Sequence, residues 1–412
     1  MDDVLAQIQQ TQFSDRKAAE TQVLSFLRST FSLDVAAVEL RPLAVSLNSF
    51  NGFLTLNTGR RLFFKTHYDS DSAIDEYYNT ILLAKAGYPV LEPVFSSTEA
   101  GRQFLIYEVV EDPSAFDLAW RIENGDLTDL GSLAKAQQDA DRQLFQIYRE
   151  TLLLQTSEQA ARAPIHQLFH HRLAGGRLER FYGAHDLTLS LAGLDLPMGE
   201  VWRAHWVVNG QSYVESLEDL VSSSLRLLKP AQAGPSVIGH GDAHNGNVFF
   251  RQRDGTLLYF DPAFAGRHDP LIDLAKPIFH NVFAMWMYFP QIKCQQTALE
   301  VHYVNGRIIV EHNYHLPPVR LMFLDSKVEH VLISTAIELR NRGWLSPEWR
   351  QQLKAALFCC PLLTMNLVDR SRFPAEISLL GFASAVEMGA DSLNERSLID
   401  LTLDEVEAAT VS

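Results

Sequence analysis

The chain has 412 residues, with 47% hydrophobic and 21% charged residues, which is the composition of a soluble globular protein. This length exceeds one simple core and predicts two lobes or domains. The formal net charge of −15 argues against a nucleic-acid-binding face, which requires a basic patch. The N-terminus lacks an apolar signal core, and the apolar run at residues 282–290 is too short to span a bilayer. We therefore expect a cytoplasmic protein without a membrane partner.

The first 110 residues alternate between helical and strand-like patterns. Residues 3–32 predict one weakly amphipathic helix, and after it VEL, RPLAVSL, FLTLNTG and RRLFFKTH are typical of strands separated by turns. The segment SAIDEYYNTILLAKAG has apolar residues at helical spacing and ends at Gly87, a residue type that commonly terminates helices. YPVLEPVFSS and RQFLIYEVV predict two more strands. Residues 1–110 are therefore expected to form an antiparallel, hairpin-rich sheet with one main helix.

From about residue 115 onward the character of the sequence changes to mainly helical. We expect helices over residues 132–158, 212–229, 271–286, 320–342, 347–370 and 376–390. The only strand-like pair recognised in this part is VFFRQRDG followed by TLLYFD, a predicted hairpin that turns at Asp254-Gly255. Residues 111–412 are therefore expected to form a large helical lobe, and the predicted fold class is α+β.

The stretch VIGHGDAHNGNVFF, residues 237–250, places unusually many polar side chains between two apolar runs. Because the predicted hairpin follows directly, we expect Asn247, beside its first strand, to lie near Asp261, at the end of its second strand. Amide and carboxylate oxygens suit Mg²⁺ better than zinc. Asp242 precedes both, and its carboxylate is free to orient a hydroxyl group. This set suits phosphoryl transfer, which depends on positioning and on neutralising phosphate charge.

The motif spacing is specific enough to indicate a family. HGDAHNGN, followed after 13 residues by DPAFAGRHDPLIDLA, resembles the aminoglycoside phosphotransferase and choline kinase family, which has a two-lobed protein-kinase-like fold. The family pattern is HGDxHxxN, then a metal-binding Asp, then a GDPxxDLA-type segment. The matching positions are His240, Gly241, Asp242, His244, Asn247, Asp261, Asp269, Pro270 and Asp273. His268 stands where the family usually has glycine.

The resemblance implies a role for each matching residue. Asp242 is expected to act as the catalytic base, and Asn247 and Asp261 as ligands of Mg²⁺. His240, His244 and Asp273 are expected to support the loop, with Asp273 also starting the helix near Leu274. ATP is the implied phosphoryl donor, GTP stays open as the nucleotide, and both nucleotide and metal are expected between the two lobes.

The resemblance also implies nucleotide-binding residues in the first 110 residues. Lys65, at the end of RLFFK, is expected to bind the α and β phosphates. Glu76, in the following helix, is expected to pair with Lys65, and the neighbouring Asp75 stays open as the partner. Glu108 and Val110 follow the strand FLIYE and are expected at the adenine edge.

One departure from the family concerns the loop that should cover the phosphates. SLNSFNGFL contains a single glycine, Gly52, so it is not a glycine-rich loop. Serine and asparagine side chains and backbone N–H groups can also contact phosphates.

The segment FHHRLAGGRLERFYG, residues 169–183, is the candidate acceptor-binding element. His170 and His171 are adjacent on a predicted helix and point to different faces, so they make a poor metal pair. Arg172 and Arg177, with Arg180, suit recognition of an anionic or sugar substrate. A solvated helix end would explain the same residues, and the role of this segment stays open.

Together these features predict ATP- and Mg²⁺-dependent phosphorylation of a hydroxyl group on a small molecule. An aminoglycoside or amino sugar, another sugar, and an amino alcohol such as choline all stay open as the acceptor. The alternative is a catalytically silent kinase-fold protein that serves as a binding or scaffold protein, but such a chain would be expected to have lost the base or a metal ligand. A protein kinase is disfavoured because HRDLxxxxN, DFG and APE segments are absent.

Overall fold

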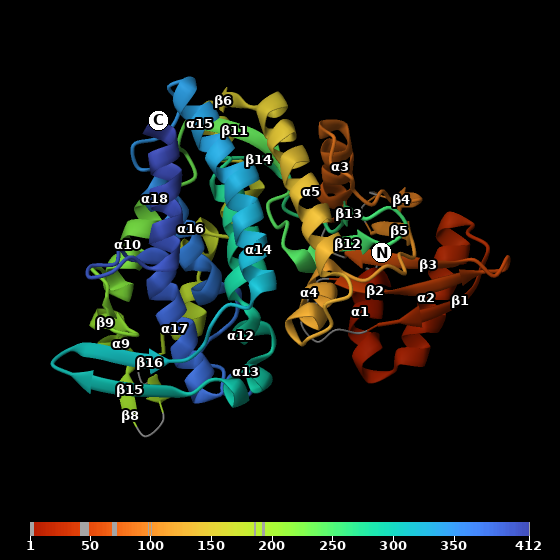
Figure 1. Ribbon diagram of the computed structural model, residues 1–412. Helices are drawn as coiled ribbons and strands as arrows, with labels where there is room; N and C mark the ends of the chain where they lie inside the picture. Colours follow the sequence, from red (N-terminus) through yellow and green to blue (C-terminus); the bar gives the residue numbers. More distant parts are fainter. Residues whose placement is uncertain are drawn as a thin grey trace. The chain divides into compact units, whose positions relative to one another are not determined.

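The computed structural model describes residues 4–41, 49–67, 72–97, 99, 101–184, 187–191 and 194–411, and Figure 1 shows its elements. The chain divides into two compact units. The sheet unit comprises Met1–Pro113 together with Leu258–Ala265, and the helical unit comprises Ser114–Leu257 together with Gly266–Ser412. The loop that carries Asp261 therefore belongs to the sheet unit, although it lies far along the chain.

The sheet unit is built on a five-stranded antiparallel sheet with the strand order β1-β2-β3-β5-β4. Its elements are α1 (Val4–Ser14), α2 (Arg16–Phe31), β1 (Val35–Leu40), β2 (Ser49–Leu56), β3 (Arg61–His67), α3 (Ser72–Ala86), β4 (Phe95–Ser97) and β5 (Phe104–Glu108). The antiparallel sheet and the main helix ending before Gly87 are confirmed. The single helix expected over residues 3–32 is wrong, because Asp15 caps α2 through a bond from Ala18 N and divides the segment. Apart from Arg41, the strand expected at RPLAVSL lies outside the described residues.

The hydrophobic core of this unit lies between α1, α2 and one face of the sheet. Val23 of α2 and Leu62 and Phe64 of β3 belong to one cluster of buried side chains. Because side chains alternate along a strand, Lys65 points to the opposite face from its neighbour Phe64. The packing of α2 against the sheet thus determines which face of β3 presents the lysine.

The helical unit contains the remaining helices. They are α4 (Ala115–Glu123), α5 (Leu130–Thr151), α6 (Ser157–Ala160), α7 (His170–Ala174), α8 (Arg177–Tyr182), α9 (Met198–Arg203), α10 (Leu217–Leu227), α11 (Ala275–Ile278), α12 (Met285–Tyr288), α13 (Pro290–Gln296), α14 (Pro318–Lys327), α15 (Ile333–Asn341), α16 (Trp349–Thr364), α17 (Ala375–Gly389) and α18 (Leu398–Val411). Every segment that was expected to be helical contains helix, and the predicted α+β fold class is confirmed. The segment expected over 271–286 is not one helix, because a π-helical turn at Phe279–Phe283 interrupts it.

The helical unit also contains more strands than the sequence suggested. They are β6 (Leu153–Gln155), β7 (Thr188–Leu191), β8 (Leu194–Pro197), β9 (His205–Val208), β10 (Gln211–Ser212), β11 (Gly234–Gly239), β12 (Val248–Arg251), β14 (Gly266–His268), β15 (Leu299–Val304) and β16 (Arg307–His312). Strand β13 (Thr256–Tyr259) completes the predicted hairpin and enters the sheet unit at Leu258. The expectation of a single strand-like pair is therefore wrong. Most of these strands span two to four residues, too few to develop a recognisable alternation. Among the described residues, no helix has the length and apolar character needed to cross a membrane.

Candidate functional site

The catalytic loop predicted at residues 240–247 begins at the end of β11. This strand is the centre of a three-stranded antiparallel sheet, β14-β11-β6. Two glycines are required here for different reasons. A Cβ atom on Gly239 would lie 2.4 Å from the Asp273 carboxylate, and Gly241 has a left-handed backbone with φ of 78°. The sequence GHGD therefore brings the backbone close to Asp273 and then turns the chain sharply.

Asp273 holds this turn in place. Its Oδ1 accepts a hydrogen bond of 2.8 Å from Gly241 N, and its Oδ2 accepts one from the Tyr148 hydroxyl of α5. The expectation that Asp273 starts the following helix is wrong, because Asp269 caps that turn instead. The Asp269 carboxylate accepts bonds from Leu271 N at 2.9 Å and from the next backbone N–H at 3.1 Å.

The Asp242 carboxylate is largely enclosed by cationic and polar side chains. Its Oδ1 lies 3.5 Å from the Lys276 ammonium, and its side chain is 17% exposed. Burial alone would raise the pKa of the Asp242 carboxyl, but Lys276, with smaller contributions from His244, His240 and Arg172, outweighs that effect, so the net pKa lies below its ordinary value. The group is therefore an ionised carboxylate at neutral pH, as a general base must be.

A chain of buried side chains continues from Asp242 through Lys276. The Lys276 ammonium lies 2.9 Å from His280 Nε2, and His280 Nδ1 lies 2.7 Å from the Tyr288 hydroxyl. Burial lowers the pKa of His280 well below its ordinary value, with a further contribution from Lys276, so the ring is neutral. Because Lys276 can only donate, Nε2 accepts, and the Nδ1 proton is directed to Tyr288. The π-helical turn carries His280 to this position.

The other loop residues expected to support catalysis lie around the same turn. His240 is buried. His244 Nδ1 accepts a hydrogen bond of 3.1 Å from Gly246 N, and its Nε2 lies 3.9 Å from Asp242 Oδ2. The Asn247 amide nitrogen donates a hydrogen bond of 3.0 Å to the Asp242 carbonyl oxygen, which fixes the orientation of the Asn247 side chain. The structure thus brings Asp242, His244 and Asn247 together within the helical unit.

Lys65 and Asp261 are brought together within the sheet unit. The Lys65 ammonium lies 2.8 Å from Asp261 Oδ1, although the two residues are 196 positions apart. Asp261 has a left-handed backbone with φ of 54°, a conformation that Asp tolerates better than most residues and that often occurs at functional sites. Asn79 of α3 donates to Pro262 O at 3.1 Å and helps to hold this loop. The meeting of Asn247 with Asp261 involves residues of different units and stays a prediction.

The remaining nucleotide-binding residues are placed as follows. Glu76 lies in α3, and its side chain falls outside the described part of the structure. Glu108 ends β5 and forms an ion pair with Arg60, and Val110 follows two residues later, partly exposed. Gly52 lies within β2, opposite Leu40, so it belongs to the sheet rather than to the phosphate-covering loop. The loop itself, residues 42–48, lies outside the described residues.

Arg172 and Arg177 of the 169–183 segment lie in the helical unit, and Arg172 is near the catalytic loop. Burial lowers the pKa of the Arg172 guanidinium, and the Asp242 carboxylate is the largest influence that raises it again. Burial also lowers the pKa of Arg177 to about 10, with repulsion from Arg172 and Arg180 adding to the effect. Arg177 Nη1 donates a hydrogen bond of 3.2 Å to Leu363 O of α16. Arg177 thus packs against α16, whereas His171, Glu179 and Arg180 of the same segment are exposed, and the role of the segment stays open.

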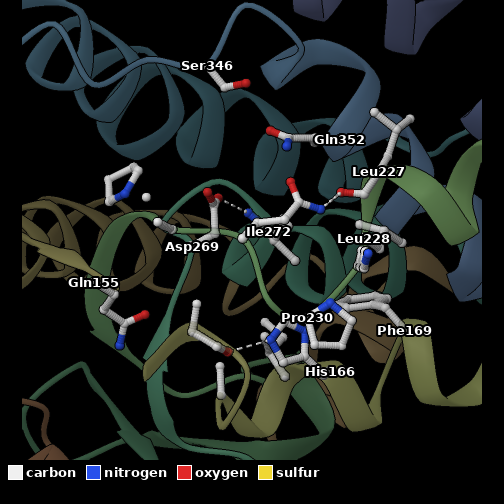
Figure 2. Close-up of a pocket in the computed structure, with 18 residues that line it drawn as sticks. Gln155, His166, Phe169, Leu227, Leu228, Pro230, Asp269, Ile272, Ser346 and Gln352 are labelled. Atoms are coloured by element: carbon white, nitrogen blue, oxygen red, sulfur yellow. Dashed lines mark hydrogen bonds between the residues drawn. The ribbon is translucent and has the colours of Figure 1, made fainter. Parts of the chain in front are cut away.

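A separate pocket of about 160 Å³ lies behind the turn that Asp269 caps. Figure 2 shows that Phe169, Leu228 and Ile272 contribute to its walls and that Asp269 bonds to the Ile272 backbone. Asp242 and Arg172 do not line this pocket. The motif residue Asp269 and Phe169 of the 169–183 segment line it, but the proposed base and metal ligands Asp242, Asn247 and Asp261 do not.

Sequence reasoning missed Lys276, His280, Tyr288 and Tyr148. The first two carried a usable signal: a lysine and a histidine four residues apart inside the apolar segment DLAKPIFHNVFAMWMYF. Charged residues are rarely enclosed without a partner, so such a pair predicts a buried polar network. Tyr148 carried no signal, because only the fold brings α5 next to Asp273.

Comparison with known proteins identifies the family. A model of the phosphotransferase enzyme family matches residues 39–289, which is more than half of the chain and includes the catalytic loop. Among curated proteins no match was found.

Several solved structures are similar to the chain over most of its length. The amicoumacin kinase hAmiN, in complex with AMP-PNP, Ca²⁺ and amicoumacin, has 14% identity and a TM-score of 0.49, with 91% of this chain and 95% of that chain covered. A thermostable aminoglycoside phosphotransferase APH(4)-Ia, in complex with AMP-PNP and hygromycin B, has 12% identity and a TM-score of 0.48, with coverage of 89% and 97%. An aminoglycoside-3'-phosphotransferase of type VIII has 17% identity and a TM-score of 0.43, with coverage of 82% and 97%. At these identities and TM-scores the similarities carry no weight in assigning a substrate.

Proposed function

Because the chain belongs to the phosphotransferase enzyme family, we propose that it transfers the γ-phosphoryl group of ATP to a hydroxyl group of a small molecule. The observation that carries this proposal is the state of Asp242. The family motif falls on a carboxylate that Lys276 keeps ionised at the end of a braced loop. A silent relative would have no reason to maintain a buried, charged carboxylate at this position.

The residues proposed to bind nucleotide and metal have the chemistry that these ligands need. Lys65 and Asp261 form an ion pair of 2.8 Å between an ammonium group and a carboxylate. The ammonium group suits a phosphate oxygen and the carboxylate suits a metal ion, and a phosphate and a metal ion also attract each other. We propose that Lys65 binds the α and β phosphates, and that Asp261 and Asn247 hold Mg²⁺. When bound, Mg²⁺ would neutralise charge on the β and γ phosphates.

In the proposed reaction, Asp242 orients the acceptor hydroxyl and accepts its proton as the oxygen attacks the γ-phosphorus of ATP, whose bond to the β–γ bridging oxygen breaks so that ADP leaves. Lys276 holds the carboxylate, and Asp273 holds the backbone turn that carries it. General base catalysis of this type contributes about 10²–10⁴-fold in rate. Because phosphoryl transfer depends largely on positioning, the bracing of the loop is as important as the base itself.

The proposal is tested by following ATP consumption with Mg²⁺ over a panel of amino sugars, neutral sugars, sugar acids, sugar phosphates and amino alcohols. Wild type is compared with Asp242→Ala and Asp261→Ala. We expect turnover with one acceptor class and loss of turnover in both variants, with nucleotide binding retained in Asp242→Ala. Absence of both turnover and Mg²⁺-dependent ATP binding in the wild type would reject the enzyme and favour the scaffold protein.

A further inference from the structure

The charge around Asp242 does not balance. Asp242 is matched by Lys276 at 3.5 Å, so neither contributes a net charge to the neighbourhood. The other groups that interact electrostatically with Arg172 are the thiols of Cys359 and Cys360, the His280 ring and the Arg177 guanidinium. Burial raises the pKa of both thiols and lowers that of His280, so these three groups are neutral. Among these described groups, no second carboxylate compensates the positive charges of Arg172 and Arg177.

Arg172 also lacks a hydrogen-bond partner at a buried atom. Its Nε is enclosed, and no acceptor in the described residues contacts it. Arg177 has one bond, to the carbonyl oxygen of Leu363, and Arg180 lies over the Phe181 ring. Among the residues that the structure describes, none of these three arginines forms an ion pair with a carboxylate.

Two other enclosed arginines of the helical unit, Arg320 and Arg350, are paired with carboxylates. Arg320 donates to Glu123 at 2.7 Å, and Arg350 donates to both Asp404 and Asp400, at 2.7 and 3.0 Å. A buried guanidinium is stable in a protein when it is paired, and it costs free energy when it is not. The chain has a net charge of −15 and thus many carboxylates, yet no carboxylate of the described residues forms an ion pair with Arg172.

The charge of Arg172 lies near the catalytic loop. Arg172 lies in α7 and Arg177 begins α8, and the turn between them passes through Gly176, whose φ is 87°. Arg172 is close enough to Asp242 for each to influence the other's proton affinity. A guanidinium binds carboxylate and phosphate oxygens through two parallel N–H bonds, so it suits an oxyanion better than a neutral hydroxyl.

We propose that Arg172, supported by Arg177, binds a negatively charged group, a carboxylate or a phosphate, on the acceptor molecule whose hydroxyl Asp242 orients. This inference rests on the proposed function and narrows it: the acceptor is a hydroxylated anion rather than an aminoglycoside or choline. The bound anion supplies the negatively charged partner that the arginines lack. Its binding to Arg172 fixes the position of the reacting hydroxyl relative to the anionic group.

Binding, rather than turnover, tests this inference most directly. Isothermal titration calorimetry would measure the affinity of wild type for glucose 6-phosphate, glucuronate, glucose and glucosamine, with and without saturating AMP-PNP and Mg²⁺. We expect the two anionic probes to bind more tightly than glucose and glucosamine under both conditions. Loss of one charge-assisted interaction in Arg172→Met should lower the affinity for the anionic probes by about tenfold or more. Arg172→Lys should retain part of the affinity.

Arg267→Met is the matched control. Arg267 is also partly buried in the helical unit, with a pKa lowered by burial, and its side chain donates to Thr151 O. This variant removes the same charge and should bind the anionic probes like wild type. Arg177→Met, at a more superficial position, repeats the test if Arg172→Met does not fold. Thermal melting of each variant establishes that the compared proteins are folded.

Three outcomes would overturn the inference. The first is that the anionic probes bind no better than glucose, and the second is that Arg172→Met and Arg267→Met bind the anionic probes with equal affinity. The third is that Arg172→Met binds AMP-PNP more weakly and no anionic probe binds beside the nucleotide. The third outcome would make Arg172 a ligand of the γ-phosphate. Anion binding without any phosphoryl transfer would reject the proposed function and leave the anion site standing. Turnover of a neutral or cationic acceptor without anion binding would reject the anion site and leave the proposed function standing.

Discussion

At the scale of single residues, the site depends on how a carboxylate remains charged inside a protein. Desolvation favours the protonated form of Asp242, and the ammonium of Lys276 more than reverses that preference. Lys276 would itself be costly to bury, but the Asp242 carboxylate and the neutral His280 ring satisfy its ammonium group. The Asp242 carboxylate and the Lys276 ammonium can therefore each be buried only because the other is present, so a variant should remove both charges or neither.

This dependence predicts a pH effect for Lys276→Met. The base is active when ionised, and removing the ammonium disfavours the ionised form, so the pKa of Asp242 should rise. The acidic limb of the kcat/KM profile should move to higher pH, while the wild type stays active below the ordinary pKa of an aspartate. The measurement is kcat/KM from about pH 3 to about 9 on the acceptor identified in the panel.

Lys327→Met is the control for Lys276→Met. Lys327 is equally buried and pairs with Asp141, so both variants lose a buried ion pair. Lys327→Met should lose stability and keep the wild-type pH profile. A Lys276→Met protein that is folded and has an unshifted acidic limb would contradict the role assigned to this lysine.

The motif residues could be located from sequence because the number of residues between them is fixed in the family pattern. The loop and the hairpin place Asp242 and Asn247 at fixed distances along the chain, whatever the rest of the fold does. Lys276 and Arg172 were harder to interpret, because their meaning depends on which distant side chains they meet. The charge imbalance around Arg172 in particular exists only in three dimensions, since it requires knowing that Cys359, Cys360 and Lys276 surround the same region.

At the scale of elements, the turn from β11 into the catalytic loop depends on close backbone packing. Gly239→Ala would place a Cβ atom 2.4 Å from the Asp273 carboxylate, so the carboxylate or the strand must move. We expect a loss of about 1–3 kcal/mol in the free energy of unfolding. Because the same carboxylate holds Gly241 N, kcat should also fall. Urea denaturation and steady-state kinetics measure the two effects.

Gly131→Ala provides the opposite case within the same unit. Gly131 lies in α5, and a Cβ atom there would meet nothing within 4 Å. Alanine has the higher helix propensity, so this variant should be neutral or more stable by up to about 1 kcal/mol. If both glycine variants behaved alike, the close approach of β11 to Asp273 would not be the cause.

Glu387 of helix α17 is expected to make the stability of the protein depend on pH, independently of the active site. Burial raises the pKa of Glu387 from 4.5 to about 7, and a hydrogen bond from Tyr213 offsets part of this rise. The folded protein therefore binds a proton that the unfolded chain releases between these two pH values. The contribution of Glu387 to stability is present below about pH 4.5 and is lost as pH rises to about 7, by up to about 3 kcal/mol. Glu387→Gln should remove this decline, and urea denaturation at a series of pH values would measure it.

The element boundaries show where periodicity in the sequence is informative. Long amphipathic segments such as α5 and α10 were recognised, because several turns repeat the same pattern. Strand β11 was not, although it carries the catalytic loop, because GPSVIG is short and apolar on both faces. The pairing of β16 with β9, parallel and distant in sequence, has no local signature at all.

At the scale of the whole molecule, overall charge is a poor guide to the acceptor. The net charge of −15 suggests attraction for cations, whereas the groups around Asp242 include Arg172, which forms no ion pair within the described part of the chain. A small ligand responds to the field at its own site, because charges more than about 10 Å away are largely screened by salt. The local arrangement therefore outweighs the total, and the acceptor inferred from it is anionic.

The division into two units places the proposed nucleotide-binding and catalytic residues on separately packed structures. Lys65 and Asp261 belong to the sheet unit, and Asp242 and Lys276 belong to the helical unit. Lys65→Met should therefore weaken nucleotide binding and raise the KM for ATP, whereas Asp242→Asn should lower kcat and leave the KM for ATP unchanged. Steady-state kinetics with varied ATP separates the two cases, and a fall of kcat in Lys65→Met at unchanged KM would contradict the role given to Lys65.

The measurement that tests the central claim most directly is ³¹P NMR of ATP and Mg²⁺ incubated with the wild type and the accepted hydroxyl compound, beside Asp242→Asn. A phosphomonoester signal should appear with the wild type as the γ-phosphate signal declines, and it should form about 10²–10⁴-fold more slowly with Asp242→Asn. Release of inorganic phosphate alone, or equal phosphomonoester formation by both proteins, would contradict the assignment of Asp242 as the base of a phosphotransferase.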